Sequence, residues 1–445
     1  NQEMDKGFYK RVFLLTLPII IQNLIVSLLN MMDTLMIGKV GEVELASVGI
    51  ANQYFFMFTL VLFGINAGGS IFVSQFWGRH DVNSIKKVTS ITLTLSIVVS
   101  LIFAFFAVLS PNEIIGIFNT RSDVISFGSQ YLSTVAFSYL FTAISLSFAF
   151  SLRSIENTIA PMVASIMALA VNVILNYVLI FGKFGFPQLG VKGAAIATNV
   201  ARAIECLVIL VVVYRKIKIV NFKWSDLKAV NRSFFSMTLK GMVPVIISEM
   251  VWGIGNLSYN IIYARMGVGA TASTQITTTI MNLLMIVIMG LGSSSMIVVG
   301  KEIGAGQKEQ GILYAKRMYR LAIGVGLMIA VVVFFGAQVL VAGFKMSESV
   351  LHSSAMILRI YSGLMIFKTY NFIMIVGILR GGGDSKYALI VQGATMWFIG
   401  IPMAFIAAFV LKLPIYAVVG MCTAEEVIKM IFLIYRFHSG KWIHD

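Results

Sequence analysis

Apolar runs long enough to cross a membrane recur twelve times along the chain, and they limit its fold more than any other feature. A membrane-spanning helix needs about 20 consecutive, mostly apolar residues. In lipid every backbone N–H and C=O must bond within the protein, so such runs predict α-helices. The sequence therefore predicts an all-α polytopic membrane protein with twelve transmembrane helices. The predicted spans cover residues 8–36, 45–77, 88–110, 125–152, 159–182, 193–214, 236–263, 272–300, 317–343, 351–379, 386–411 and 414–436.

Composition agrees with a membrane protein and explains the excess of positive charge. Of the 445 residues, 58% are hydrophobic and 12% are charged, whereas soluble proteins carry about 25% charged residues. A net charge of +15 in a soluble protein would suggest nucleic-acid binding. In a membrane protein, Lys and Arg gather in cytoplasmic loops. With the N-terminus inside, most of the 34 Lys and Arg residues fall on one side. Both termini are therefore predicted in the cytoplasm, with membrane lipid and not nucleic acid as a partner.

The chain repeats itself after a shift of 226 residues. The shift aligns landmarks that include Pro18 with Pro244, Asn30 with Asn256, Gly41 with Gly267, Gly64 with Gly290 and Gly78 with Gly304. Six helices per half is an even number, so both halves enter the membrane from the same side, as parallel repeats do. The repeat predicts an N-lobe over residues 1–218, a basic cytoplasmic linker over 219–235 and a C-lobe over 236–445.

A parallel six-helix repeat is typical of transporters, because two similar bundles can expose a central site to each face in turn. Nothing in the sequence indicates an enzyme or a cofactor. The glycine run at 381–383 lacks the Lys-Ser/Thr of a phosphate-binding loop and has no preceding strand. The two cysteines, Cys206 and Cys422, lie in apolar segments and predict neither a disulfide nor a metal site. An alternative of another class is a non-transporting membrane scaffold or sensor, for which a soluble domain or long tail would argue.

The first span carries one carboxylate within a polar stripe. Side chains three or four residues apart share a helix face, which places Asn23, Ser27, Asn30 and Asp33 together. A charged residue at membrane depth costs about 2.5–3.5 kcal/mol, so Asp33 should face a wet interior. The stripe predicts a cavity. The alternative is a buried Asp that only bonds to neighbouring helices.

The seventh span carries a second carboxylate, Glu249, with Trp252, Asn256 and Tyr259 on or near its stripe. These residues are predicted to line the cavity. Lys368 lies deep in the tenth span, too far from the membrane surface to reach it easily, and it belongs to the same predicted group. Glu249 is its expected partner. The alternative is that Glu249 is neutral or paired for structural reasons.

Two amides in the fifth span, Asn172 and Asn176, are four residues apart and share a face. Amide oxygens coordinate cations, and amide N–H groups bond carboxylates, so both residues suit a site with Asp33. The alternative is hydrogen bonding between helices, at about 0.6 kcal/mol for each bond.

Charged residues in the sixth and twelfth spans are predicted to pair locally. Arg202 and Glu205 lie three residues apart, and Glu425 and Lys429 lie four apart. Both pairs are interpreted as structural.

Taken together, these residues resemble the multidrug and toxic compound extrusion (MATE) family over nearly the whole chain. The specific motifs are the opening from Pro18 through the run Asp33-Thr-Leu-Met-Ile-Gly38 to Leu45-Ala46, NVILNYVLIFG with LGVKGAAIAT (189–198), GILRGGGDS (377–385) and WFIGIPMAF (397–405). The resemblance implies a bacterial inner-membrane antiporter with two lobes around a V-shaped central cavity. Such proteins export organic cations in exchange for H⁺ or Na⁺.

The resemblance also implies roles for single residues. Asp33 matches the acid of the family's first helix, and Asn172 matches an Asn of its N-lobe cation site. Asn176 stands where many members carry Asp, and Thr198 resembles a Thr that completes the site. Glu249 resembles a Glu of the seventh helix. Asp33 is also the candidate metal ligand if the coupling ion is Na⁺.

The sequence therefore predicts a monomeric secondary antiporter that exports amphipathic organic cations. One carboxylate in a sparse oxygen set argues for H⁺ rather than Na⁺. The first rival is a flippase for lipid-linked saccharides or lipids on the same scaffold. Anionic head groups would require several cationic residues in the cavity, and Lys368 and Arg202 are the candidates.

Overall fold

The computed structural model describes residues 2–444, with side chains from residue 6 onward, and this part of the chain contains helices and no strand. It divides into two compact units, one up to Ile246 and one from Ile247 on. The helix α10 (Arg232–Arg265) starts in the first unit and ends in the second. The predicted lobe and linker boundaries stay a prediction, as does a cavity between the lobes.

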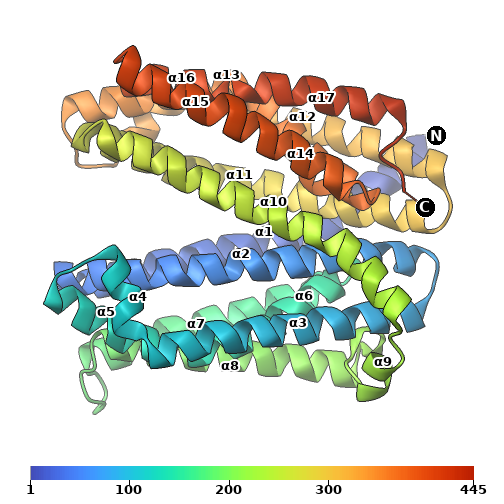
Figure 1. Ribbon diagram of the computed structural model, residues 1–445, viewed down its shortest axis with the longest axis horizontal. Coiled ribbons are helices and arrows are strands. Elements are labelled where there is room, and N and C mark those ends of the chain that lie inside the picture. Colours follow the sequence, from blue (N-terminus) through green and yellow to red (C-terminus); the bar gives the residue numbers. More distant parts are fainter. Residues whose placement is uncertain (1, 445) are drawn as a thin grey trace. The chain divides into compact units, whose positions relative to one another are not determined.

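The first unit runs from α1 into the first half of α10. Figure 1 shows α2, α3, α6, α7 and α8 of this unit running side by side, in agreement with their contacts. The remaining elements of the first unit are α1 (Gln2–Gly38), α2 (Glu42–Gly78), α3 (Val82–Leu109), α4 (Pro111–Phe118), α5 (Ser122–Val135), α6 (Phe137–Ser154), α7 (Ile159–Phe181), α8 (Val191–Arg215), η1 (Lys218–Val220) and α9 (Trp224–Lys228).

The second unit holds the remaining helices, three of which contain or continue into wide π-helical turns. Its elements after α10 are α11 (Val268–Gly304), α12 (Lys308–Ala342), α13 (Glu348–Phe372), η2 (Ile373–Leu379, π), α14 (Ser385–Thr395), η3 (Met396–Gly400, π), α15 (Ile401–Phe405), η4 (Ile406–Val410, π), α16 (Ile415–Thr423) and α17 (Glu425–Ser439). Among residues 2–444, π-helical segments occur in this unit alone. Such segments often mark functional sites in helices.

All twelve predicted spans are helical. Ten helices of the described chain are long and apolar enough to cross a membrane, and α5 with α6, which meet at a bend of 48°, would make eleven. The twelfth predicted span corresponds to two shorter helices, α16 and α17, which are separated at Ala424.

The internal repeat appears in the element boundaries. The helices α2 and α11 both contain 37 residues, and their first and last residues differ by the 226-residue shift. Pro18 and Pro244 both lie inside the first long helix of their half. Proline removes one backbone hydrogen bond from a helix interior, so each half begins with a helix that is weakened at the corresponding turn.

Glycines end α7 and allow α8 to pack closely against it. Gly182 follows α7 with φ of +68°, a left-handed conformation that glycine adopts without a Cβ clash. The next turn leads into α8, whose Gly193 lies against the backbone of Leu179. This close approach of α7 and α8 brings their polar residues near α1, where the candidate site lies.

Candidate functional site

Asp33 of α1 meets the two amides of α7 that the sequence placed beside it. The side-chain N–H of Asn176 donates to Asp33 Oδ1, and it also donates to Asn172 Oδ1 at 2.7 Å. Asn172 and Asn176 are fully buried, whereas Asp33 is half-buried. The structure therefore brings together three of the four residues predicted for cation coupling, with the carboxylate on the more accessible side.

Thr198 of α8 lies in the same region, next to Tyr131, a residue that the sequence pattern did not indicate. Its hydroxyl donates to the backbone oxygen of Ala194 at 3.0 Å. The buried phenol of Tyr131, on α5, lies close to both Thr198 and Asp33. Tyr131 gave no signal in the sequence, because it stands in a mixed segment, SQYLST, without a neighbouring charge.

The oxygen set around Asp33 is small. Asn176 uses its N–H groups on Asp33 and Asn172, and its own Oδ1 is buried with no hydrogen-bond partner. That orphan oxygen and the carboxylate could face a bound cation. Hard cations such as Ca²⁺ take about six to eight oxygen ligands in proteins, so this set is sparse for a metal ion. Among the described residues, no group of three or more His, Cys, Asp or Glu could hold a metal ion.

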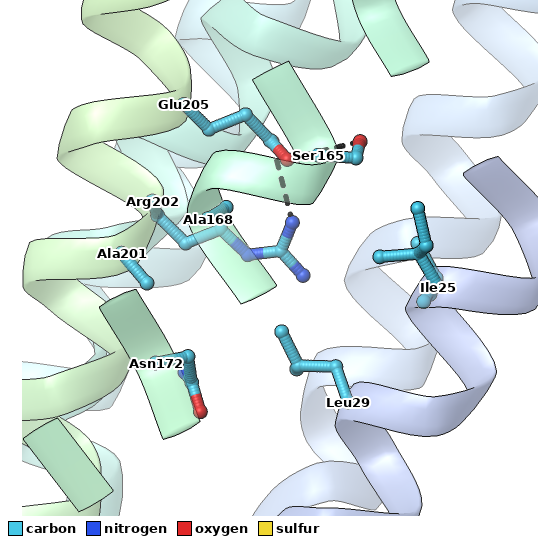
Figure 2. Close-up of a pocket in the computed structure, with 9 residues that line it drawn as sticks. Ile25, Leu29, Ser165, Ala168, Asn172, Ala201, Arg202 and Glu205 are labelled. Carbon is cyan, nitrogen blue, oxygen red and sulfur yellow. Dashed lines mark hydrogen bonds and ion pairs between the residues drawn. The ribbon is translucent and has the colours of Figure 1, made fainter. Parts of the chain in front are cut away.

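A pocket in the first unit lies beside Asn172, between α1, α7 and α8. Figure 2 shows Ile25 and Leu29 on one side and Arg202 on the other, with Arg202 directed toward Glu205. The guanidinium lies 3.4 Å from Glu205 Oε1. The predicted pairing of these two residues is therefore confirmed, but the pair lines a pocket instead of being packed away.

Hydrogen bonds continue from Glu205 to α1 and α6. Ser165 donates to Glu205 Oε2 at 3.3 Å, and Gln22 donates to Ser165 Oγ at 3.1 Å. Arg153, at the end of α6, donates to Gln22 Oε1. This chain of bonds ties the middle of α1 to three other helices of its own unit.

The rest of the polar stripe on α1 is less enclosed than predicted. Asn23 and Ser27 are half-buried, and Asn30 is exposed. Asp33 is the only one of the four for which the structure gives a hydrogen bond to another helix among the described residues. The polar stripe of α1 is therefore exposed over part of its length. Asp33 is the member that bonds to a neighbouring helix.

Glu249 of α10 pairs with Arg380 and not with Lys368, so the predicted pairing is wrong. Arg380 Nη2 lies 3.2 Å from Glu249 Oε1, and both side chains are largely buried. Arg380 corresponds to Arg153 in the repeat, and each arginine contacts a residue 131 positions earlier in the chain, Glu249 or Gln22. The 226-residue shift itself aligns Glu249 with Asn23, the neighbour of Gln22. Each half thus joins an arginine to its own first helix, once with a neutral partner and once with an acid.

Lys368 of α13 lies over the ring of Tyr361, with Nζ 4.2 Å from the ring centroid. It makes no ion pair within the described chain, and it interacts electrostatically with Glu426, Lys429 and Glu425 of α17. The face of an aromatic ring attracts a cation and replaces part of its lost hydration. Lys368 therefore belongs to a cluster with α17, which the sequence did not indicate.

The other residues predicted on the α10 stripe have different surroundings. Trp252 is 42% exposed. Asn256 donates to the backbone oxygen of Trp252 at 3.2 Å. Tyr259 turns toward α17, where its hydroxyl donates to Glu425 at 3.4 Å. Tyr259 and Lys368 therefore both lie near Glu425, whereas Glu249 pairs with Arg380, so the three predicted residues do not form one site.

The predicted pairing of Glu425 with Lys429 also needs correction. Lys429 Nζ lies 3.6 Å from Glu426, three residues earlier on α17. Glu425 bonds to Tyr259 instead. As neighbours on a helix, Glu425 and Glu426 lie on different faces.

Comparison with known proteins decides the family. The sequence pattern of the MatE family matches residues 18–178 and again 244–406. The chain belongs to the MatE family. Two successive matches, which begin at Pro18 and Pro244, also confirm the internal repeat. A MatE protein is a transporter and not an enzyme, so the scaffold or sensor alternative falls away.

Similar proteins cover the MatE chain nearly from end to end. A probable multidrug resistance protein NorM from Thermotoga maritima is 25% identical, with 97% of this chain and 93% of the relative covered. The uncharacterized transporter YisQ from Bacillus subtilis is 24% identical over 99% and 96%. These relatives and the apolar helices indicate a bacterial membrane protein.

Solved structures confirm the MatE fold. A crystal structure of MATE in the bent conformation has a TM-score of 0.87 at 17% identity, covering 97% of this chain and 96% of that one. A MOP superfamily transporter from Pyrococcus furiosus has a TM-score of 0.86 at 18% identity over the same shares. At these identities the likeness concerns the fold alone.

Proposed function

We propose that this protein is a secondary active multidrug efflux antiporter of the inner membrane, which exports amphipathic organic cations in exchange for H⁺. The observation that carries the proposal is the buried bonding of Asp33 to Asn176 inside a membrane span. Ionisable residues within spans are costly and usually mark ion or substrate pathways. The relatives named as probable multidrug resistance proteins support the cargo class.

The site favours H⁺ over Na⁺ as the coupling ion. Asp33 is its single carboxylate, and Asn172 Oδ1 already accepts a bond from Asn176. A proton needs one oxygen and no coordination shell, whereas a metal ion needs several ligands.

The exchange follows from the bonds that Asp33 makes. When Asp33 is charged, the bond from Asn176 is charge-assisted, and such bonds are roughly twice as strong as neutral ones. A proton that binds the carboxylate removes this charge, so α1 is held less firmly against α7. A cationic cargo loses its negatively charged counterpart in the same step. We propose that this change lets the cargo leave outward while the proton continues inward.

The two six-helix repeats supply the alternating movement. Transporters built from repeats expose a central site to each face in turn. Inward movement of one positive charge down the membrane potential provides about 2.3 kcal/mol for each 100 mV. This energy sets the scale of cargo accumulation for each ion. We expect a monomer, with both termini in the cytoplasm.

Replacing Asp33 by Asn tests the mechanism. In everted vesicles, D33N should lose ethidium transport driven by an imposed H⁺ gradient, because the amide cannot take up the proton. The control is D123N, since Asp123 lies in the first turn of α5, away from the site, and pairs with the exposed Arg121 at 2.8 Å. H⁺ and Na⁺ gradients are imposed separately. Full H⁺-driven transport by D33N would overturn the mechanism, and transport driven by Na⁺ alone would overturn the choice of ion.

A flippase for lipid-linked saccharides is less well supported. Anionic head groups would require cationic side chains with free charge. Arg202 is paired with Glu205 in the pocket, and Arg380 is paired with Glu249. Lys368 is neutralised in part by the acids of α17. The buried cations of these spans are therefore mostly compensated within their own units.

A further inference from the structure

The second unit contains a buried carboxyl group whose bonding is incomplete. Glu425 is the first residue of α17, directly after the break in the twelfth span, and it is 7% exposed. Its Oε1 accepts a bond from Tyr259 at 3.4 Å. Its Oε2 is buried and has no hydrogen-bond partner among the described residues. A charged oxygen that is buried without a hydrogen-bond donor is costly. We therefore expect Glu425 Oε2 to bind a ligand.

The internal repeat relates this carboxyl group to the Asp33 site. The 226-residue shift places Tyr259 at the position of Asp33, on the first long helix of the second half. In the first half, that position carries the acid and a neighbouring helix supplies the hydrogen-bond donor. In the second half, the position carries the donor and α17 supplies the acid. Both halves therefore pair one carboxyl group with one neutral donor at the repeated position.

Gly400, the last residue of η3, leaves room for these two polar groups. A Cβ atom at position 400 would collide with the hydroxyl of Tyr259, and it would lie 2.6 Å from Glu425 Oε2. The Tyr259 hydroxyl and Glu425 Oε2 therefore occupy space beside the backbone of Gly400 that any other side chain would fill. The wide π-helical turn of η3 ends at this residue.

The groups around Glu425 favour a proton over a metal ion as its ligand. The groups that face it are Tyr259 from α10, Lys368 from α13, Cys422 from α16, and Glu426 and Lys429 from α17 itself. A metal ion needs several oxygen ligands, and Oε2 is the oxygen of Glu425 that has no hydrogen-bond partner among the described residues. A proton requires only the free Oε2.

Glu426, the next residue, serves as an internal comparison. It accepts a bond from Asn371 at 2.6 Å and lies 3.6 Å from Lys429. These contacts give the Glu426 carboxylate both a hydrogen-bond donor and a cationic neighbour. Glu425 Oε2 has neither contact, because it is buried without a hydrogen-bond donor. A proton on that oxygen would remove the uncompensated charge that makes such burial costly.

We propose that Glu425 is a second proton-exchanging site of this transporter, in addition to Asp33. The proton comes from water and bonds to Oε2, which changes the charge of the side chain from −1 to zero. Tyr259 keeps donating to Oε1 in both states, and release returns the proton to water. The link to cargo export rests on the proposed antiport, whereas the proton exchange itself does not.

Infrared difference spectroscopy between acid and alkaline buffer tests the site without any cargo. The wild-type protein in liposomes should show carbonyl bands of protonated carboxyl groups that vanish at alkaline pH. E425Q should lose one of these bands, and D33N should lose a different one. E426Q, the matched neighbour, should keep both. Y259F should keep the Glu425 band at a shifted frequency, because a hydrogen bond to its carboxyl group is lost.

Ethidium transport in the same liposomes connects the site to function. E425Q should move fewer protons for each ethidium than the wild type does, as measured with an internal pH dye. Spectra of E425Q and Y259F that match the wild type would overturn the proposal, as would loss of the band in E426Q instead. A wild-type protein that shows the Glu425 band but transports no ethidium would refute the proposed antiport and leave the proton site standing.

Discussion

Two arginines at repeated positions hold the first long helix of their half in different ways. Arg153 donates to the amide of Gln22, and Arg380 forms an ion pair with Glu249. The two contacts are similar although their partners are one position apart in the repeat, so the scaffold accepts a neutral or an acidic partner near this point. The acid in the second half is then either a structural variation or a group with an additional role.

Substitution of Glu249 separates these two cases. E249Q should stay within about 1 kcal/mol of the wild type, the net value of a typical hydrogen bond, because a glutamine, Gln22, accepts from the corresponding arginine in the first half. E249L should destabilise the protein by about 3–5 kcal/mol, since it leaves the buried Arg380 without a partner. The midpoint of thermal unfolding in detergent measures both effects. A stable E249Q variant that fails to transport ethidium would show that Glu249 acts on cargo or protons.

At the scale of elements, glycine permits the close contact of α7 and α8. A Cβ atom at Gly193 would lie 2.6 Å from the backbone oxygen of Leu179, and neither backbone can move without shifting its helix. G193A should therefore cost about 1–3 kcal/mol through overpacking. The matched control is G324A in α12, where nothing lies within 4 Å of the added atom. That variant should be neutral or slightly stabilising, as judged from thermal unfolding in detergent.

The segment after α17 is anchored by Trp442. Its indole N–H donates to the backbone oxygen of Phe437 at 3.1 Å, and its ring stacks on the same residue. His444 reaches Asp384 at 2.9 Å, which Arg436 also binds at 2.7 Å. The glycine turn before α14, at residues 381–383, therefore contacts this segment of the chain, and the backbone N–H of His444 donates to the backbone oxygen of Gly382 at 2.8 Å.

Removal of the indole should loosen this anchor. W442A should destabilise the second unit by about 3–5 kcal/mol, the usual cost of emptying a buried aromatic position. W224A is the control, because Trp224 is 70% exposed. Proteolysis of the C-terminal segment in detergent should accelerate in W442A alone. Equal proteolysis rates for both variants would contradict the anchoring role.

For the whole molecule, the sequence predicted most of the fold and part of the site. Span length and the repeat are regular patterns, so twelve helical segments and two halves followed from them. Asn172 and Asn176 could be joined to Asp33 because four-residue spacing fixes a helix face. The partners of Glu249 and Lys368 could not be predicted, since the rotation of one helix against another is set by packing over its whole length. Glu425 was assigned the wrong partner for the same reason, and Tyr131 was missed because its segment carries no charge.

The orientation in the membrane is a property of the whole chain that cysteine labelling can test. Cys206 and Cys422 are free but buried, so neither should react with an impermeant maleimide. Phe184, in the α7–α8 loop, is 83% exposed, and the charge bias of the loops places it outside. Ser225 is exposed in α9, within the predicted cytoplasmic linker. F184C should therefore be labelled on intact spheroplasts and S225C only in everted vesicles. The reverse pattern would place the basic loops outside and reject cytoplasmic termini.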